Sequence, residues 1–313
     1  LPENESGSGF LHRVLQSTAE TFGSDLDAAR VPHAGAFKKS FSDAVVRFEA
    51  ARIAGDKRGA IARHLVSSTL GSLELVENGR ATPLVEALRE RREAPATATR
   101  ALGGRPGWVA ELPLDGRTYR GIEVLGAVDR LFAQHHLTAA ARDALRWIVE
   151  HIESEGGALH LRGRKFALMG AGAELSPAAM LLAADATVLW IDVNDAARMI
   201  ERSIGLSGEL VQPERHLDVL GDPCGVAASI RRFADDGPVH VGMFAYAPGA
   251  SRELRVAGAM DAIVRSLGPD VVRSVSMLVS PTSPGEMPRP SASRPIALTF
   301  ESLPWSVAMP EVV

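Results

Sequence analysis

The chain has 313 residues, of which 46% are hydrophobic and 23% charged, and its formal net charge is −4. This balance offers no bulk attraction to nucleic acid or to an anionic membrane, so we expect neither as a partner. The single cysteine, Cys224, excludes an internal disulfide framework and a cysteine-based zinc site, and we expect no bound metal. The length is sufficient for two domains.

The first ten residues, LPENESGSGF, are polar and glycine-rich and do not resemble a secretory signal. The longest apolar runs are interrupted by charged residues and are too short to span a membrane. The sequence therefore predicts a cytoplasmic protein. Self-association into a homo-oligomer stays open.

The first half of the chain predicts mostly helical structure. Residues 1–40 lack sustained periodicity, which favours a partly ordered arm. Residues 41–155 predict a helical domain, and its clearest helix begins after Thr138, a suitable N-cap, and ends before Gly156. The segment 103–121 between these helices is rich in glycine and proline and predicts a loop or a small hairpin.

The pattern changes near residue 156, where short apolar runs begin to alternate with helical ones. This alternation is typical of an α/β domain with a mainly parallel, doubly wound sheet, which we expect over residues 156–313. The apolar runs predicted as strands are KFALM, TVLWID, HLDVLGD, VHVGMFAY, VRSVSMLVS and PIALTF.

A glycine turn follows the first of these strands, in the stretch ALMGAGAELSPAAM. Gly170 permits a tight turn, and Gly172 lets the backbone approach a ligand because no Cβ intervenes. Ser176 and Pro177 predict the N-cap and first residue of the next helix. In a doubly wound sheet this turn normally contacts the phosphates or ribose of a nucleotide.

Two acidic residues follow the glycine turn in an informative order. Asp192 ends TVLWID about twenty residues after Gly172, where a carboxylate can accept hydrogen bonds from the hydroxyls of an adenosine ribose. Asp222 ends HLDVLGD, and we expect it to contact the adenine amino group; a role as the cap of the helix after Pro223 stays open beside this one. Because Asp192 would repel a 2′-phosphate, the pattern favours NAD over NADP as the cofactor.

This arrangement resembles the Rossmann-fold NAD(P)-binding superfamily, in particular the short-chain dehydrogenases and reductases, over about residues 160–290. The segment YAPGASRELRVAGAMDAIVRSLG resembles their catalytic tyrosine helix, and the resemblance implies that Tyr246 is the proton donor and that Ser280 lies beside the nicotinamide. Where that family has a lysine four residues after the tyrosine, this chain has Ala250. The cation that lowers the pKa of the tyrosine is then expected to be Arg252 or Arg255, which begin the same helix.

Glu174 keeps other functions open, because a carboxylate facing a pyrophosphate would be unfavourable. S-adenosylmethionine has no phosphate and carries two positive groups, and VLWIDVNDAARMIERS is similar to the second strand and helix of Rossmann-like methyltransferases. The favoured function is an NAD(P)-dependent oxidoreductase acting on a small-molecule substrate, with segments 103–121 and 281–294 as walls of its site. The alternatives are a methyltransferase and a non-catalytic nucleotide-binding sensor or partner subunit.

Overall fold

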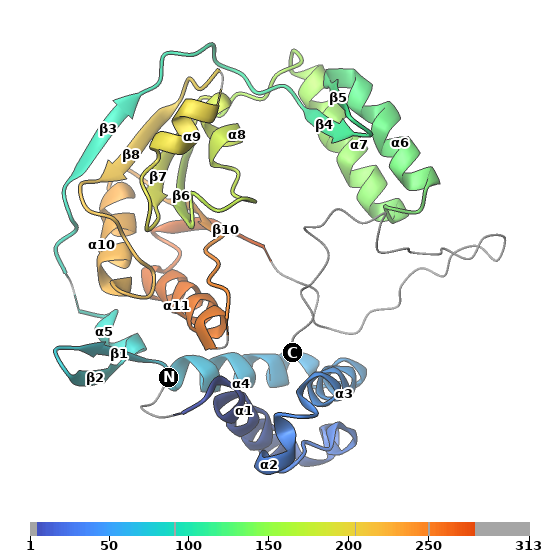
Figure 1. Cartoon of the computed structure of the whole chain (residues 1–313), viewed down its shortest axis with the longest axis vertical. Helices are drawn as coiled ribbons and strands as arrows, with labels where there is room; N and C mark the ends of the chain where they lie inside the picture. The colour runs from blue at the N-terminus through green and yellow to red at the C-terminus, as the bar shows by residue number, and fades with distance from the viewer. Residues whose placement is uncertain (1–4, 91, 204, 250, 279–313) are drawn as a thin grey trace. The chain divides into compact units, whose positions relative to one another are not determined.

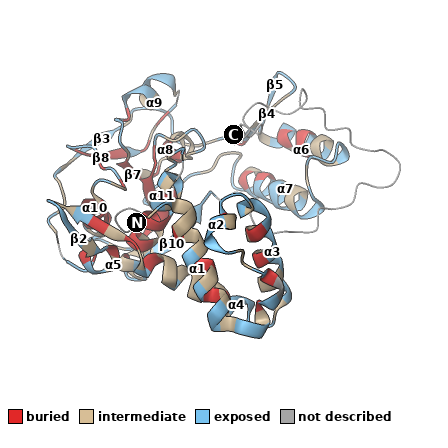
Figure 2. Ribbon diagram, turned by 60° about the horizontal axis from the view of Figure 1, so that its bottom comes forward, coloured by how far each residue is buried: buried red, intermediate tan, exposed pale blue. Residues whose placement is uncertain are grey.

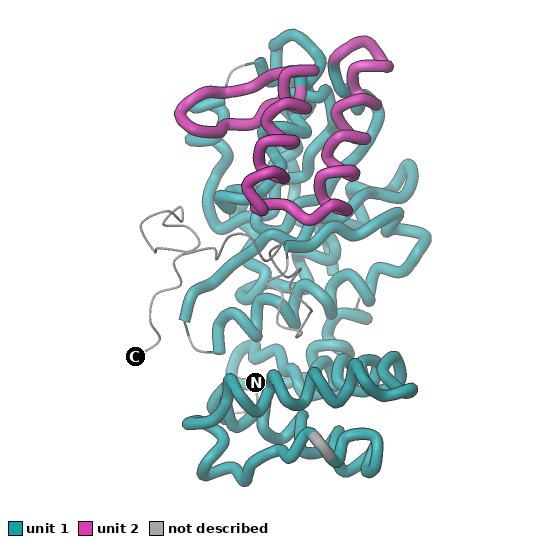
Figure 3. Tube along the Cα trace, turned by 90° about the vertical axis from the view of Figure 1, so that its right-hand side faces the viewer, with its two compact units in different colours: residues 1–109, 158–284 teal, residues 110–157, 285–313 magenta. Residues whose placement is uncertain are grey.

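A computed structural model of the chain describes residues 5–90, 92–203, 205–249 and 251–278. The chain divides into two compact units, which Figure 3 colours separately. Unit 1 comprises residues 1–109 and 158–284, and unit 2 comprises residues 110–157 and 285–313. Unit 2 therefore includes a segment inserted into the chain of unit 1.

Unit 1 is an α/β structure with a six-stranded, mostly parallel sheet (Figure 1). The strands, in their order across the sheet, are β10 (Val272–Met277), β9 (Val239–Met243), β6 (Lys165–Met169), β7 (Thr187–Ile191), β8 (Glu209–Pro213) and β3 (Thr97–Ala101). Five of these strands are parallel, and β3 pairs with β8 in the antiparallel direction at one edge. Successive apolar side chains along each strand point to opposite faces of the sheet, so each face has its own hydrophobic core.

Helices cover both faces. Met169, Ile191 and Val211 point to the face that packs against α10 (Pro223–Phe233) and α11 (Ser251–Leu267). Leu168 and Trp190 point to the other face, which packs against α8 (Ala178–Ala183), and α9 (Ala197–Arg202) follows β7. Figure 2 shows the resulting concentration of buried residues in the sheet and along α10. A sheet buried on both faces explains why its strands are short apolar runs.

The N-terminal part of unit 1 is helical with its own apolar cluster, which includes Leu15, Phe37, Phe48 and Ile61. Its elements are α1 (Gly7–Phe22), η1 (Gly23–Asp25), η2 (Asp27–Ala29), α2 (Ala34–Phe37), α3 (Phe41–Ala54) and α4 (Arg58–Gly71), followed by a hairpin of β1 (Glu74–Glu77) and β2 (Arg80–Pro83) and by α5 (Leu84–Ala87). Residues after α4 join the core of the sheet: a Cβ on Gly258 of α11 would lie 2.7 Å from Leu73 Cδ1.

This organisation differs from the predicted one at both N-terminal boundaries. Residues 7–22, predicted as part of a loose arm, form α1, which buries Phe10, Val14, Leu15 and Thr18. The glycines at its start hide that apolar spacing in the sequence. The segment 41–155 is divided between the two units, because Leu70, Leu73 and Leu75 pack into the core of the sheet.

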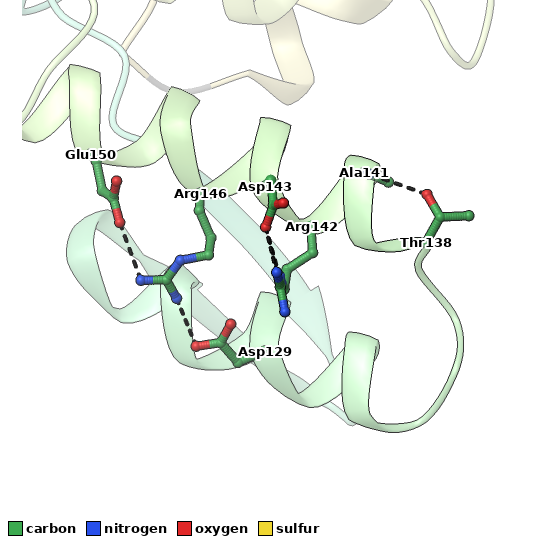
Figure 4. A network of polar contacts seen from close by, with 7 residues as sticks. All are labelled: Asp129, Thr138, Ala141, Arg142, Asp143, Arg146 and Glu150. Carbon is green, nitrogen blue, oxygen red and sulfur yellow. Dashed lines mark hydrogen bonds and ion pairs between the residues drawn. The ribbon is translucent and has the colours of Figure 1, made fainter. Parts of the chain in front are cut away.

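Unit 2 contains a hairpin and a pair of helices: β4 (Glu111–Leu114), β5 (Arg117–Arg120), η3 (Gly121–Glu123), α6 (Val124–Ala133) and α7 (Ala139–Ser154). The hairpin lies within the segment 103–121, and Asp115 and Gly116 form its turn with φ values of 53° and 73°. The predicted cap of α7 is also confirmed, since Thr138 Oγ1 accepts a hydrogen bond of 3.1 Å from the Ala141 amide. Arg146 joins the two helices through Asp129, at 2.7 Å (Figure 4).

Most predicted strands of the second half are confirmed, but the third is wrong. The residues that form β8 are 209–213, whereas HLDVLGD, at 216–222, forms the turns between β8 and α10. Leu217 and Val219 are apolar because their side chains enter the core from these turns. The predicted strand PIALTF, at 295–300, lies outside the described residues. Among the helices that the structure describes, none has the length and apolarity needed to cross a membrane.

Candidate functional site

A cleft of about 510 Å³ lies at the carboxyl ends of the central strands of unit 1. The chain passes from β6 to β7 and β8 on one side, then returns to β9 on the other side of β6. Connections that leave a parallel sheet in opposite directions create a crevice at this point, where α/β proteins commonly bind ligands. The described lining residues are Gly170, Gly172, Ala173, Ile191, Asp192, Val193, Asn194, Leu217, Asp218, Val219, Leu220, Ala245, Tyr246, Ala247, Pro248, Arg252 and Val256.

Gly170 brings two strand-end loops together. Its φ of +81° is unfavourable for residues with a side chain, and a Cβ here would lie 2.2 Å from the Ala245 nitrogen in the loop after β9. Its own amide donates to the Ile191 carbonyl over 2.8 Å. Only glycine fits where the turn after β6 meets the ends of β7 and β9.

Gly172 and Asp192 are in direct contact across the cleft. The Gly172 amide donates to Asp192 Oδ2 over 2.9 Å, and the Asn194 amide donates to Asp192 Oδ1 over the same distance. The Asn194 side chain also donates to Oδ1, at 3.2 Å. An ionised carboxylate has about four acceptor positions, so these three bonds leave Oδ2 able to accept one more from a ligand.

Trp190 supports this arrangement from the core. Its buried indole donates from Nε1 to the Asn194 carbonyl over 2.8 Å. A Cβ on Gly172 would lie 3.3 Å from Trp190 Cζ2 and equally far from Asp192 Oδ2. The indole therefore packs beneath the glycine turn and also fixes the loop that carries Asp192.

The structure corrects the assignment of the second acid. Asp222 is the N-cap of α10, where Oδ1 accepts from the Gly225 amide at 2.8 Å and Oδ2 forms an ion pair with Arg215. Asp222 does not line the cleft, whereas Asp218 does. Asp218 Oδ1 accepts from the Leu220 amide over 2.9 Å, which holds the carboxylate in a tight turn. The mistake follows from the strand prediction, which moved the strand end past Asp218.

Glu174 is exposed and does not line the cleft. The sequence leaves two opposite interpretations of the Glu174 carboxylate: it points away from a bound pyrophosphate, or it attracts a positively charged ligand. Neither finds support among the described contacts. The helix that follows begins after Pro177, one residue later than predicted, and Ser176 Oγ accepts from the Ala178 amide at 3.4 Å.

Tyr246 and Arg252 line the cleft on the side of β9. Tyr246 lies in the loop before α11 rather than on the helix, and the residue is 71% exposed. No hydrogen bond or ring contact joins it to Arg252 in the part of the chain that the structure describes. The expected cation for the tyrosine is thus absent from its described contacts. Ser280, Ala250 and the segment 281–294 lie outside the described residues.

The structure therefore brings together Gly170, Gly172, Asp192, Tyr246 and Arg252, all of which the sequence singles out. It adds a group that sequence reasoning missed, namely Asp218 with its apolar neighbours Leu217, Val219 and Leu220. The sequence feature that could have indicated this group is LDVL (217–220), in which apolar residues flank an aspartate. No model of a protein family and no curated protein matches this chain.

Proposed function

We propose that this chain binds NAD or NADH in the cleft and is an NAD-dependent oxidoreductase. The observation that carries the proposal is the Asp192 carboxylate, held at the end of β7 by the glycine turn that follows β6. If the five parallel strands β6, β7, β8, β9 and β10 are numbered 1 to 5 along the chain, their order across the sheet is 3-2-1-4-5. This is the strand order of a Rossmann-like domain. That fold hosts many functions, so the argument depends on the residues of the site.

The described contacts suit an adenosine. Asp192 Oδ2 can accept a hydrogen bond from a ribose hydroxyl, because only the Gly172 amide occupies it. Asp218 is exposed in the cleft and can accept from the adenine amino group, while the partly exposed Leu220 offers apolar surface to the ring. Gly172 keeps the space beside Asp192 open, since any side chain there would meet the carboxylate.

The charges of the cleft favour NAD over its competitors. A 2′-phosphate on the adenosine ribose would meet the Asp192 carboxylate, so NADP should bind more weakly. S-adenosylmethionine carries the same adenosine, but its sulfonium and ammonium groups need carboxylates beyond the ribose. Among the lining residues, Asp192 and Asp218 are the acids, and the proposal uses both for the adenosine. The end of β6 offers no further carboxylate, because Met169 at this position is buried and apolar.

NAD, when bound, supplies a hydride acceptor, and NADH a hydride donor. The chain itself orients the cofactor through Asp192 and Asp218. Tyr246 presents a phenol at the rim of the same cleft, where it can donate a hydrogen bond to a substrate oxygen or exchange a proton with water. The substrate is a small molecule that enters beside Tyr246.

Isothermal titration calorimetry with NADH, NADPH and S-adenosylmethionine tests this proposal. We expect NADH to bind most tightly, and Asp192→Asn to weaken it by about tenfold or more, as expected for a lost charge-assisted hydrogen bond. Asp195→Asn is the matched control. Asp195 lies in the same loop, accepts a hydrogen bond of 2.9 Å from the Ala197 amide at the start of α9, and does not line the cleft.

Binding of S-adenosylmethionine alone would overturn the proposal in favour of a methyltransferase. Equal loss of NADH affinity in the Asp192 and Asp195 variants would show that the cofactor lies elsewhere. Circular dichroism of both variants separates a change in affinity from a loss of folded protein.

A further inference from the structure

The guanidinium of Arg252 has no described partner inside the protein. Arg252 lies in the first turn of α11 and lines the cleft, and its side chain is exposed. Among the described residues, no acidic group lies within 4.0 Å of its guanidinium and no aromatic ring lies beneath it. A cation in the first turn of a helix faces the positive end of the helix dipole, so α11 gains no stability from this residue.

The glycine turn has few amides left to bind an anion. Between Gly170 and Ser176, five amides already donate within the protein: Gly170 and Ala171 to the Ile191 carbonyl, Gly172 to Asp192, Ala173 to the Gly170 carbonyl, and Ser176 to the Ala173 carbonyl. Turns that cradle phosphates do so with free amides. A pyrophosphate here would need its charge balanced by another group.

The charged residues that line the cleft are Asp192, Asp218 and Arg252. Two carboxylates next to a pyrophosphate would repel it, and Arg252 is the cation that lies on the same surface. Its guanidinium presents a planar set of donors that fits two phosphate oxygens at once.

We propose that Arg252 binds the pyrophosphate of the dinucleotide, in place of the backbone amides of the glycine turn. This inference rests on the proposed function, because it assumes that the adenosine occupies the side of the cleft formed by Asp192 and Asp218. It gives Arg252 a binding role, separate from the role of tuning Tyr246 that the sequence suggested.

A graded series of ligands tests this assignment: adenosine, ADP and NADH, each titrated into the full chain by calorimetry. We expect Arg252→Gln to weaken ADP and NADH by about tenfold, the lower end for a charge-assisted hydrogen bond, and to change adenosine by less than about twofold. Arg252→Lys should lose less, since it keeps the charge but not the planar fork. Arg255→Gln, one turn further along α11 at an exposed position outside the cleft, is the control and should bind all three ligands normally.

Salt supplies a second readout. Raising the salt from about 0.05 to 0.5 M should weaken ADP binding to the unaltered chain more than to Arg252→Gln, because added ions screen a charge pair at an exposed site. Adenosine binding should not respond to salt in either protein.

Three results would overturn the role of Arg252 while leaving the proposed function intact. These are ADP binding that survives Arg252→Gln, equal losses for adenosine and ADP, or equal losses in the Arg252 and Arg255 variants. Failure of the proposed function looks different: adenosine and NADH would then bind no less tightly to Asp192→Asn than to the unaltered chain.

Discussion

Replacing Gly170 by alanine should destabilise unit 1 strongly. At φ of +81° an alanine costs about 1–2 kcal/mol relative to glycine. The new Cβ would also lie 2.2 Å from the Ala245 nitrogen and 2.6 Å from the Phe244 carbonyl carbon, so backbone must move. Forced displacement in a packed region costs about 1–3 kcal/mol. Together these terms predict a loss of about 2–5 kcal/mol in the free energy of unfolding.

Urea denaturation followed by far-ultraviolet circular dichroism measures this loss. Gly172→Ala is the matched control, because its backbone has no positive φ and its added Cβ would come no closer than 3.3 Å to Asp192 or Trp190. We expect the control to lose less than about 1 kcal/mol, as for a tight but adjustable contact. If Gly170→Ala unfolds within about 0.5 kcal/mol of the unaltered chain, the level of an ordinary surface change, the close approach of the two loops is incorrect.

Trp190→Phe should lower stability by about 1 kcal/mol because it removes the donor to the Asn194 carbonyl, and it should weaken NADH severalfold by loosening the loop of Asp192. Calorimetry checks this, and unchanged NADH affinity would refute the supporting role of the indole. Burial, and then the positive charges of two nearby arginines, lower the pKa of His240 from its ordinary 6.5. The unfolded chain therefore takes up this proton more readily than the folded one, so stability is complete above about pH 6.5 and falls as the pH decreases toward the folded pKa. Thermal melts between about pH 8 and 5.5 should show this slope, and His240→Gln should flatten it; parallel profiles for both proteins would contradict the assignment.

Local patterns predicted the central part of the sheet well. KFALM and TVLWID form β6 and β7 because each is a short apolar run that must be buried on both faces. The turn glycines and Asp192 were found for the same reason, since their positions follow from the ends of these strands. The α/β class therefore follows from the sequence.

Other strands carry too little local signal. In β3 the sequence TATRA lies largely exposed along the edge of the sheet and pairs with β8, whose residues are about a hundred positions away. Such a strand is specified by the neighbour that it meets and not by its own periodicity. β8 has only Leu210 and Val211 as consecutive apolar residues, which is why HLDVLGD was the more convincing strand.

The wrong role expected for Asp222 follows from the wrong position expected for the third strand. A carboxylate before Pro223 satisfies the pattern for a helix cap equally well, and the structure uses it as one. Identifying Asp218 required knowing that Leu217 and Val219 turn inward after the strand has ended. This information is tertiary, because it depends on the core against which those side chains pack.

The inserted segment of unit 2 leaves the chain of unit 1 after Trp108 and returns before Leu159, and these two residues bond to each other through both backbone groups, at 3.0 and 2.8 Å. Residues paired in this way are about 5.5 Å apart at Cα, the separation that a short turn spans. All the strands of the described six-stranded sheet lie outside residues 110–157, so the insertion interrupts none of the hydrogen bonds of that sheet. The junction therefore closes the backbone of unit 1 across the insertion, so the length and sequence of residues 110–157 can change without altering the strand pairing of the sheet.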